Sequence, residues 1–530
     1  MTLNRRFTPM MLLMISINGM VGSAWLFAPL YAAKIAGAGA IFAWLIGGVA
    51  TAIIALTFAE LSVLFPVAGG TAQIPQMSHG MLTSFMLSWA AWLSAMTMAP
   101  IEVQAILQYA STYFTSLMVV DAAGVHVLTN WGLGWAALLM MSFCFINVAS
   151  FQGLIRFNFA LFFFKISVII IAVYALIHTS FFTENFSGMH TGLFSSTGWH
   201  AILTAVATGG VAFAFTGFKH GVELAGETKQ MAIAIPLAIV GSVVGCLILY
   251  LGLQVAFIGA VHPDALANGW ENLSFLGDVG PFAGLAAGLG LFWLVKLLYI
   301  DAVISPAGAG LIYVTSTARI LYAMSEIGYV PRWLTYLNKQ KFPVAAILVN
   351  FVLGMFLFLP LPGWQAMVSF LVSGMVISYA IGPIALLCMR YELPDRKREF
   401  RVPFAPVFCA LAFYFCNLLS YWTGWDTIYK LSIAMGIGMI FFVVAVVRGR
   451  MPLDSLGIKS ALWIIPYFSG LVLISYLGAF GGGLNVIPFG WDFLVIGIFS
   501  LTILVLAVKN RASFAGEKVY DTRFAAIPTI

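Results

Sequence analysis

The chain alternates between long apolar stretches and short polar connections. A helix needs about 20 apolar residues to cross a bilayer, and the stretches reach or approach that length. We therefore predict an all-α polytopic membrane protein with about fourteen transmembrane helices. They are expected at residues 10–33, 40–65, 83–117, 131–150, 157–179, 199–225, 231–260, 284–318, 343–362, 366–390, 402–424, 428–448, 461–480 and 490–509.

Two of these segments contain residues that weaken a helix near the middle of the membrane. Residues 16–29 read Ser-Ile-Asn-Gly-Met-Val-Gly-Ser-Ala-Trp-Leu-Phe-Ala-Pro, and residues 209–219 read Gly-Gly-Val-Ala-Phe-Ala-Phe-Thr-Gly-Phe-Lys. Lipid cannot satisfy the backbone groups that such a break frees, so they must face protein, a cavity or a ligand. Two broken segments at corresponding positions of two half-sequences are typical of the binding site of a secondary transporter.

The basic residues predict the orientation of the chain. With the N-terminus in the cytoplasm, 20 of the 25 Lys and Arg residues fall in cytoplasmic connections or tails, three lie within spans, and only Lys34 and Lys430 fall outside. Cytoplasmic loops of membrane proteins carry this excess of Lys and Arg. We expect an even number of spans, both termini in the cytoplasm, and location in the cytoplasmic (inner) membrane.

Composition narrows the class of protein further. Hydrophobic residues make up 62% of the 530 residues and charged residues 8%, whereas soluble domains have about 25% charged residues. The net charge of +6 follows from the cytoplasmic basic residues and does not indicate nucleic acid. No nucleophile–base pair, nucleotide loop or metal-ligand spacing occurs, so we expect no enzyme activity, metal or cofactor. The five cysteines lie in apolar stretches and are expected to be buried, reduced and structural.

Five charged residues remain inside the predicted spans: Glu102, Lys165, Lys219, Lys296 and Asp301. A charge at the bilayer centre costs about 2.5–3.5 kcal/mol, so such residues face the bundle interior and usually have a function. The alternative is that they pair with one another and only hold helices together. Lys296 lies nearer the end of its span and can extend its ammonium group toward the membrane surface.

Two of the intramembrane positions are candidates for proton handling. Lys165 follows three Phe residues, and an apolar pocket that destabilises its charge would let it load and release a proton. The alternative is a fixed charge that replaces a bound cation. Asp301 and Ser305 are four residues apart and share one helix face. Glu102 is a further candidate, with a less defined role.

The broken segments and several other motifs resemble the amino acid–polyamine–organocation (APC) superfamily of permeases. The resemblance covers roughly residues 8–448. Its motifs are Gly22-Ser23-Ala24-Trp25-Leu26-Phe27-Ala28-Pro29, Ala59-Glu60-Leu61 with Phe65-Pro66 and Gly69-Gly70, Phe215-Thr216-Gly217-Phe218 with Glu223 to Lys229, and Ser305-Pro306-Ala307-Gly308 with Tyr313, Arg319 and Gly328-Tyr329-Val330-Pro331.

This resemblance implies a domain organisation. The fold would contain two inverted repeats of five helices, at residues 10–179 and 199–390. Additional transmembrane helices would follow at residues 402–509, and cytoplasmic tails would occupy residues 1–9 and 510–530. Broken helices 1 and 6 would then come from corresponding positions of the two repeats.

The resemblance also implies a binding site for an amino acid. The substrate α-carboxylate would bind backbone N–H groups at Gly22, Ser23 and Ala24, which agrees with the affinity of helix N-termini for anions. The α-amino group would meet carbonyl groups near Met20 and in the second break, where the substrate-binding residues are Phe215, Thr216 and Gly217. Proton-coupled members of the superfamily have a lysine in the fifth helix, which corresponds here to Lys165.

Two positions depart from the pattern of the superfamily. Ala24 stands where Gly is frequent, and Lys219 stands where many exchangers have Glu. A fixed cation near the site disfavours cationic substrates and suits a second carboxylate. The surrounding sequence is similar to the aspartate–proton symporter branch.

We therefore expect a proton-coupled symporter that imports an acidic amino acid, with the lipid bilayer, protons and the amino acid as its partners. The chain would act as a monomer or homodimer. Three alternatives stay open: exchange, for example of glutamate against an amine, permeation of neutral amino acids, and a membrane sensor that does not transport.

Overall fold

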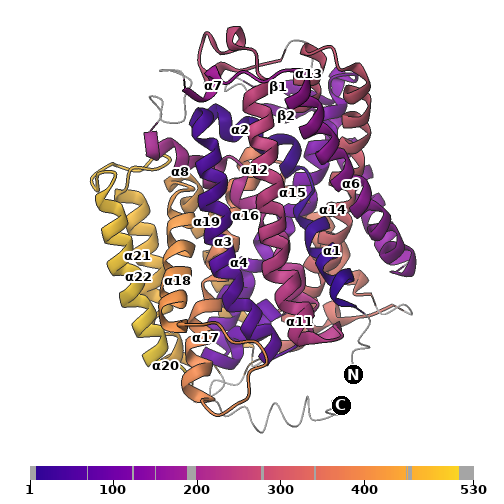
Figure 1. Cartoon of the computed structure of the whole chain (residues 1–530). Coiled ribbons are helices and arrows are strands. Elements are labelled where there is room, and N and C mark those ends of the chain that lie inside the picture. The colour runs from indigo at the N-terminus through magenta and orange to yellow at the C-terminus, as the bar shows by residue number, and fades with distance from the viewer. Residues whose placement is uncertain are drawn as a thin grey trace.

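The computed structural model describes residues 7–67, 70–121, 125–149, 151–187, 198–275, 280–338, 342–448, 451 and 456–512. The predicted tails lie largely outside this range. The described chain forms a bundle of helices with one two-stranded antiparallel sheet, so the predicted all-α class is confirmed (Figure 1).

The first part of the chain contains the first broken helix and a long central helix. The elements are α1 (Pro9–Met20), α2 (Ala24–Ala36), α3 (Ala40–Leu64), α4 (Gly70–Ala110), β1 (Met118–Val120), β2 (His126–Leu128), α5 (Asn130–Ala149) and α6 (Phe151–Thr179). Helix α4 begins well before the predicted residue 83, because residues 70–80 form a helical segment too polar to read as a span. It bends at Gly80, where φ is 82°.

The second part contains the second broken helix. It comprises α7 (Glu184–Ser187), α8 (Gly198–Thr208), α9 (Val211–Ala214), the 3₁₀ turn η3 (Thr216–Phe218), α10 (Lys219–Glu223), the 3₁₀ turn η4 (Ala225–Glu227), α11 (Met231–Pro236), the π turn η5 (Leu237–Gly241), α12 (Ser242–Ala260), the 3₁₀ turns η6 (Pro263–Leu266) and η7 (Trp270–Asn272), α13 (Pro281–Gly288), α14 (Phe292–Ile327), the 3₁₀ turn η8 (Arg332–Thr335), α15 (Val344–Leu357), α16 (Gly363–Tyr379) and α17 (Ile381–Glu392). The short 3₁₀ turn η1 (Gly37–Gly39) joins α2 to α3, and η2 (Thr115–Leu117) precedes β1.

The last helices are α18 (Ala405–Tyr421), α19 (Trp425–Val447), α20 (Ile458–Ala461), α21 (Ile464–Leu477) and α22 (Trp491–Lys509). The helices α21 and α22 lie at one side of the bundle, against α18 and α19 (Figure 1). Helix α1 begins, and α22 ends, at the end of the bundle opposite to β1 and β2 (Figure 1).

The number of spans depends on how the broken helices are counted. Within the described residues, 11 helices are long and apolar enough to cross a membrane, or up to 12 if the pair Gly198–Thr208 and Val211–Glu223, bent by 42°, is one span. The prediction of about fourteen is higher for three reasons. Parts of the first two predicted helices run together as Ala24–Leu64, Val344–Leu357 is short, and the bent pair is divided.

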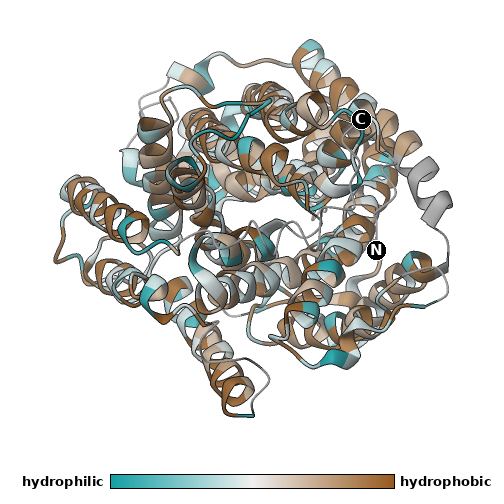
Figure 2. Ribbon diagram, turned by 90° about the horizontal axis from the view of Figure 1, so that it is seen from below, coloured by the Kyte–Doolittle hydropathy of each residue, from teal (hydrophilic) through white to brown (hydrophobic). Residues whose placement is uncertain are grey.

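The helices sort into central and peripheral ones by burial. Helix α4 packs along α14 and α16, and the apolar spans of α4 and of α16–α17 are wholly buried, whereas that of α19 is only 28% buried. Large apolar side chains such as Ile170, Ile248 and Ile440 are exposed on the outer helices. Figure 2 shows hydrophobic residues along nearly all helices of the bundle. An outer surface of this kind suits lipid rather than water.

Candidate functional site

The first predicted break lies at the centre of the bundle. Helix α1 ends at Met20 and α2 begins at Ala24, with Ser23 at the N-cap position and no hydrogen bond from its side chain to the cap. The end of a helix leaves carbonyl groups without partners, and the start of the next leaves N–H groups. The break therefore presents acceptors and donors within four residues of chain.

The carbonyl groups at the end of α1 are satisfied by side chains from three other helices. Lys165 Nζ donates to Val21 O at 2.7 Å and to Asn18 O at 3.3 Å. Tyr313 Oη donates to Gly19 O at 2.7 Å, and Tyr250 Oη donates to Met20 O at 2.9 Å. A cation at a helix C-terminus also complements the helix dipole. The lysine thus ties α6 directly to the end of α1.

The N–H side of the break is occupied by a carboxylate. Ser23 N donates to Glu102 Oε2 at 2.7 Å, and the Glu102 side chain is buried. A Cβ atom at Gly22 would lie only 2.5 Å from Glu102 Oε1. The carboxylate can come this close to the backbone because glycine has no Cβ atom. The N-terminus of α2 therefore binds a carboxyl group, and in this structure that group belongs to α4.

A second carboxylate secures the start of α2 from the other side. Trp25 Nε1 donates to Asp301 Oδ2 at 3.1 Å, and Ser305 Oγ donates to Asp301 Oδ1 at 2.7 Å. The predicted pairing of Asp301 with Ser305 on one face of α14 is thus present. The charge of Lys165 interacts with those of Glu102 and Asp301, so the structure brings the candidate proton carriers together.

The second break meets the first. Gly210, with φ of 91°, starts α9, and the chain turns again through η3 before α10. A Cβ atom at Gly217 would lie 2.6 Å from Met20 N and 2.7 Å from both the carbonyl carbon of Gly19 and Ser16 O. The backbone of η3 therefore packs directly against the end of α1, and the predicted residues Phe215, Thr216 and Gly217 lie beside it.

Aromatic side chains cover the break on the α2 side. Trp364 Nε1 donates to Ser23 Oγ at 3.0 Å, and the Trp364 ring stacks on Phe27 and Tyr31, with centroids 5.5 Å away in both cases. Phe213 meets the Trp364 ring edge to face at 5.8 Å. Beside the second break, a small cavity lined by Phe215, Thr216 and Tyr379 among others has room for about one water molecule.

Backbone and ionic contacts join the segment before α1 to the segment after α10. Phe7 N donates to Glu227 O at 3.1 Å, and Lys229 N donates to Phe7 O at 2.8 Å, so the segment before α1 is bound to the segment after α10. Arg319 Nη1 of α14 lies 3.0 Å from Glu227 Oε1. These contacts hold α1, the second break and α14 together.

Lys219 is buried on α10, and its charged neighbour is Glu223 on the same helix. Its Nζ lies 3.7 Å from Met375 Sδ, and its charge interacts with that of Glu223, one helical turn further on. Glu223 Oε1 accepts a hydrogen bond from Thr71 Oγ1 at 2.6 Å. Lys296, by contrast, is exposed at the surface of the bundle, as expected for a lysine near the end of a span.

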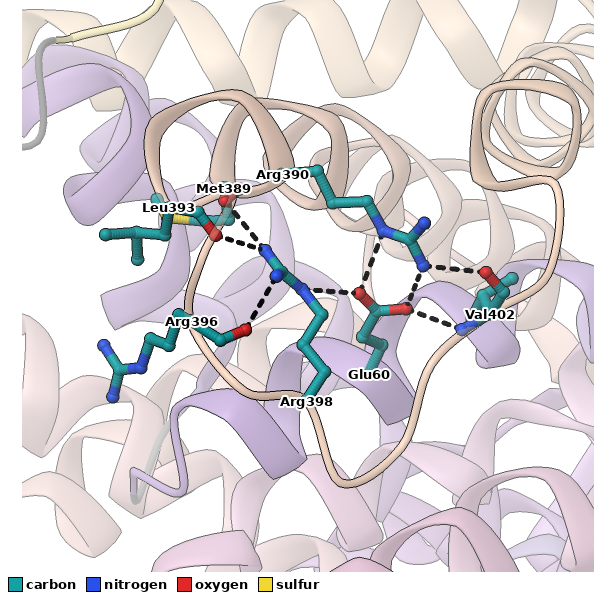
Figure 3. Close-up of polar contacts among 7 residues, drawn as sticks. All are labelled: Glu60, Met389, Arg390, Leu393, Arg396, Arg398 and Val402. Carbon is teal, nitrogen blue, oxygen red and sulfur yellow. Dashed lines mark hydrogen bonds and ion pairs between the residues drawn. The ribbon is translucent and has the colours of Figure 1, made fainter.

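A further ionic cluster joins α3 to α17 and the connection after it (Figure 3). The fully buried Glu60 carboxylate accepts hydrogen bonds from Arg390 Nε at 3.0 Å, Arg390 Nη2 at 2.6 Å and Val402 N at 2.7 Å. Arg398 Nε lies 3.1 Å from Glu60 Oε1, and Arg398 Nη2 donates to the carbonyl groups of Met389 and Leu393. The sequence presents Glu60 only as part of a motif, without this role.

Several site residues were not singled out from the sequence. Tyr250 and Trp364 carry no charge, and an aromatic residue in an apolar helix has no signal that separates a ligand of the break from a packing residue. Tyr313 appeared only within a motif. The five cysteines are buried and unpaired, as predicted. In the described part of the chain, no three His, Cys, Asp or Glu side chains are placed to hold a metal ion.

A membrane bundle in which two broken helices meet at a buried polar centre is the architecture of a secondary transporter. A family model described as amino acid permease matches residues 7–463. The chain therefore belongs to the amino acid permease family, as the resemblance to the APC superfamily predicts.

Individual relatives are similar over nearly the whole chain. The glutamate/serine transporter AimA of Bacillus subtilis is 35% identical over 517 residues, which cover 96% of this chain and 94% of the relative. The aspartate-proton symporter of the same organism is 32% identical over 498 residues, covering 93% and 94%. The branched-chain amino acid permease BcaP, also from Bacillus subtilis, is 25% identical over 465 residues, covering 83% and 93%.

Proposed function

We propose that the protein is a proton-coupled symporter that imports an acidic amino acid, aspartate or glutamate, across the cytoplasmic membrane. One observation carries the proposal: a carboxylate already binds the N–H of Ser23 at the start of α2. The break is thus suited to the α-carboxylate of an amino acid. The names of two relatives, a glutamate/serine transporter and an aspartate-proton symporter, support the substrate class.

In this proposal the amino acid binds across both breaks. Its α-carboxylate contacts backbone N–H groups at Gly22, Ser23 and Ala24, and its α-amino group contacts carbonyl groups at Met20 and in the stretch 215–217. Helix N-termini and C-termini favour these opposite charges. The side chain of the substrate then selects among amino acids, with Lys219 as the proposed partner of a second carboxylate.

Protons supply the driving force in the proposed cycle. Lys165 is the proposed main carrier, with Asp301 or Glu102 as the second and Ser305 as a partner of Asp301. An amino acid of net charge −1 needs more than one proton for net inward movement of positive charge. Each charge that crosses 100 mV contributes about 2.3 kcal/mol. The basic residues near the ends of α1 and α22 support a cytoplasmic location for both termini.

The test is transport by the purified protein in proteoliposomes. With an acidic exterior, labelled aspartate or glutamate should accumulate, and a proton ionophore should abolish the accumulation. A competition panel of all amino acids then ranks the substrates. Preference for a cationic amino acid would contradict the proposal. Uptake that requires amino acid inside the vesicles would show exchange, and binding without flux would show a sensor.

Uptake of a neutral amino acid such as serine is a second candidate function. Two observations favour it: the name of one relative includes serine, and Glu223 offsets the charge of Lys219. In this case serine would compete as well as glutamate in the panel, and pH-driven uptake would move net positive charge with a single proton.

A further inference from the structure

Glu102 occupies the place that the proposed function gives to the substrate. Its Oε2 accepts the hydrogen bond of Ser23 N at 2.7 Å, and its Oε1 lies against Gly22. These are the backbone groups proposed to bind the α-carboxylate of an amino acid. The protein thus presents to its own helix break the same chemical group that the substrate carries.

Two carboxylates cannot share this position. The space beside Gly22 is filled, since a Cβ atom there would lie 2.5 Å from Glu102 Oε1 and 2.8 Å from the Ala309 methyl carbon. When both groups are ionised, they also repel each other in a buried site. A substrate carboxylate can therefore reach Ser23 N only after the Glu102 carboxylate has left it.

The contacts of Glu102 make it a displaceable ligand. In the described residues, the ion pairs closer than 4.0 Å do not include Glu102, although its side chain is buried. The ammonium group of Lys165 donates instead to the carbonyl groups of Asn18 and Val21. The Glu102 carboxyl group is thus held by Ser23 at the start of α2, with the Lys165 charge close by, and a substrate carboxylate can make the same contacts in its place.

We propose that Glu102 is an internal ligand of the first break, which competes with the carboxylate of the substrate and sets its apparent affinity. The proposal rests on the proposed function in one respect only, that the external ligand carries a carboxylate. Trp364, which donates to Ser23 Oγ, closes over the break while Glu102 is bound. Binding of substrate then requires Glu102 to withdraw along α4.

A small carboxylate tests the occupancy without any amino acid. In the full-length protein in detergent, Glu102→Ala vacates the position, and formate should bind there and raise the midpoint of thermal unfolding by about 2 °C or more, because a ligand that binds only the native state stabilises it. Wild type should respond only at about tenfold higher formate concentration, and chloride of equal ionic strength controls for salt. Glu223→Ala, which removes a buried carboxylate from a hydroxyl partner, is the matched control.

An equal response of Glu223→Ala, or no response of Glu102→Ala, would overturn the proposal. If Glu102→Ala does not fold, the affinity of Glu102→Gln for the substrate is measured instead. The amide keeps the shape but loses the charge, and a neutral hydrogen bond is about half as strong as a charge-assisted one. Affinity for the best competitor in the panel should rise in the order wild type, Gln, Ala. The overall rise is about tenfold if Glu102 leaves the break a tenth of the time.

The two proposals fail separately. Formate stabilisation without binding of acidic amino acids would support Glu102 as internal ligand and contradict the proposed substrate. Binding of acidic amino acids with unchanged or weaker affinity in both Glu102 variants would contradict the internal ligand alone.

Discussion

At the scale of single residues, the centre of the site depends on one ammonium group. Lys165 Nζ donates to two carbonyl groups at the end of α1, so its loss leaves buried acceptors without a partner. Because a charge inside the membrane is costly, the sequence alone indicates three candidate functional residues, Lys165, Glu102 and Asp301. That argument did not identify the other side chains that bind the break, because Tyr250 and Trp364 act through a hydroxyl and an indole N–H that are common in apolar helices.

We expect Lys165→Gln to reduce pH-driven uptake by a factor of ten or more, because an unsatisfied buried partner costs about 1–3 kcal/mol and the proposed proton carrier is gone. Counterflow of labelled substrate should persist if the amide still supports α1. Lys296→Gln, on the exposed surface of α14, is the control and should leave uptake within about twofold of wild type. Intact pH-driven uptake in Lys165→Gln would refute the proton role.

Lys219 carries the prediction on selectivity. If its ammonium group contacts the second carboxylate of the substrate, Lys219→Gln should weaken competition by aspartate and glutamate about tenfold or more, since a hydrogen bond to a charged group contributes about 1.5–3 kcal/mol. Competition by serine should be unaffected. An equal loss for all three amino acids would indicate that Lys219 serves only to balance Glu223.

At the scale of elements, the two breaks act as one unit because their backbones touch. The glycines of both segments, together with Ser16, Asn18 and Ser23 in the first, predicted that these two helices are broken, since such residues weaken a helix where lipid cannot compensate. The resemblance implied that the two breaks form one site, but the apolar pattern alone could not predict that η3 packs on the end of α1, because this contact joins residues about 200 positions apart. Helix α4 also starts earlier than predicted, since its first turns are too polar for a hydropathy criterion.

Gly217→Ala tests this contact between the breaks. The added methyl group would meet backbone atoms of Gly19, Met20 and Ser16, which cannot rotate away. We expect a loss of about 1–3 kcal/mol of stability, typical of overpacking, together with a loss of uptake. Gly252→Ala on α12, where a Cβ atom meets nothing within 4 Å, should be neutral or stabilising in the same thermal unfolding and uptake assays.

At the scale of the whole molecule, the Glu60 cluster joins helices from the two halves of the chain. Glu60 on α3 is bound by Arg390 of α17 and by Arg398 of the following connection, at the end of the bundle where α1 begins (Figures 1 and 3). The all-α class and the short connections follow from the apolar pattern alone. The cluster does not, because its arginines read simply as cytoplasmic charges.

Glu60→Gln should lower stability by about 1–3 kcal/mol, because it leaves two partly buried arginines without their carboxylate. The change is measured as a shift in thermal unfolding in detergent, with Glu326→Gln as control. Glu326 is exposed on α14 and accepts a hydrogen bond from Tyr322 Oη. Equal effects of both substitutions would show that the cluster contributes no more than a surface carboxylate does.

The way in which the first break is satisfied has a kinetic consequence. Lys165, Tyr313, Tyr250 and Glu102 together supply partners for its carbonyl and N–H groups, and Trp364 closes over it. A carrier whose own side chains complete the site does not need a bound solute to cross from one orientation to the other. In the proposed cycle we therefore expect the return half to proceed without cargo, so that a single round of uptake leaves the protein free to begin the next.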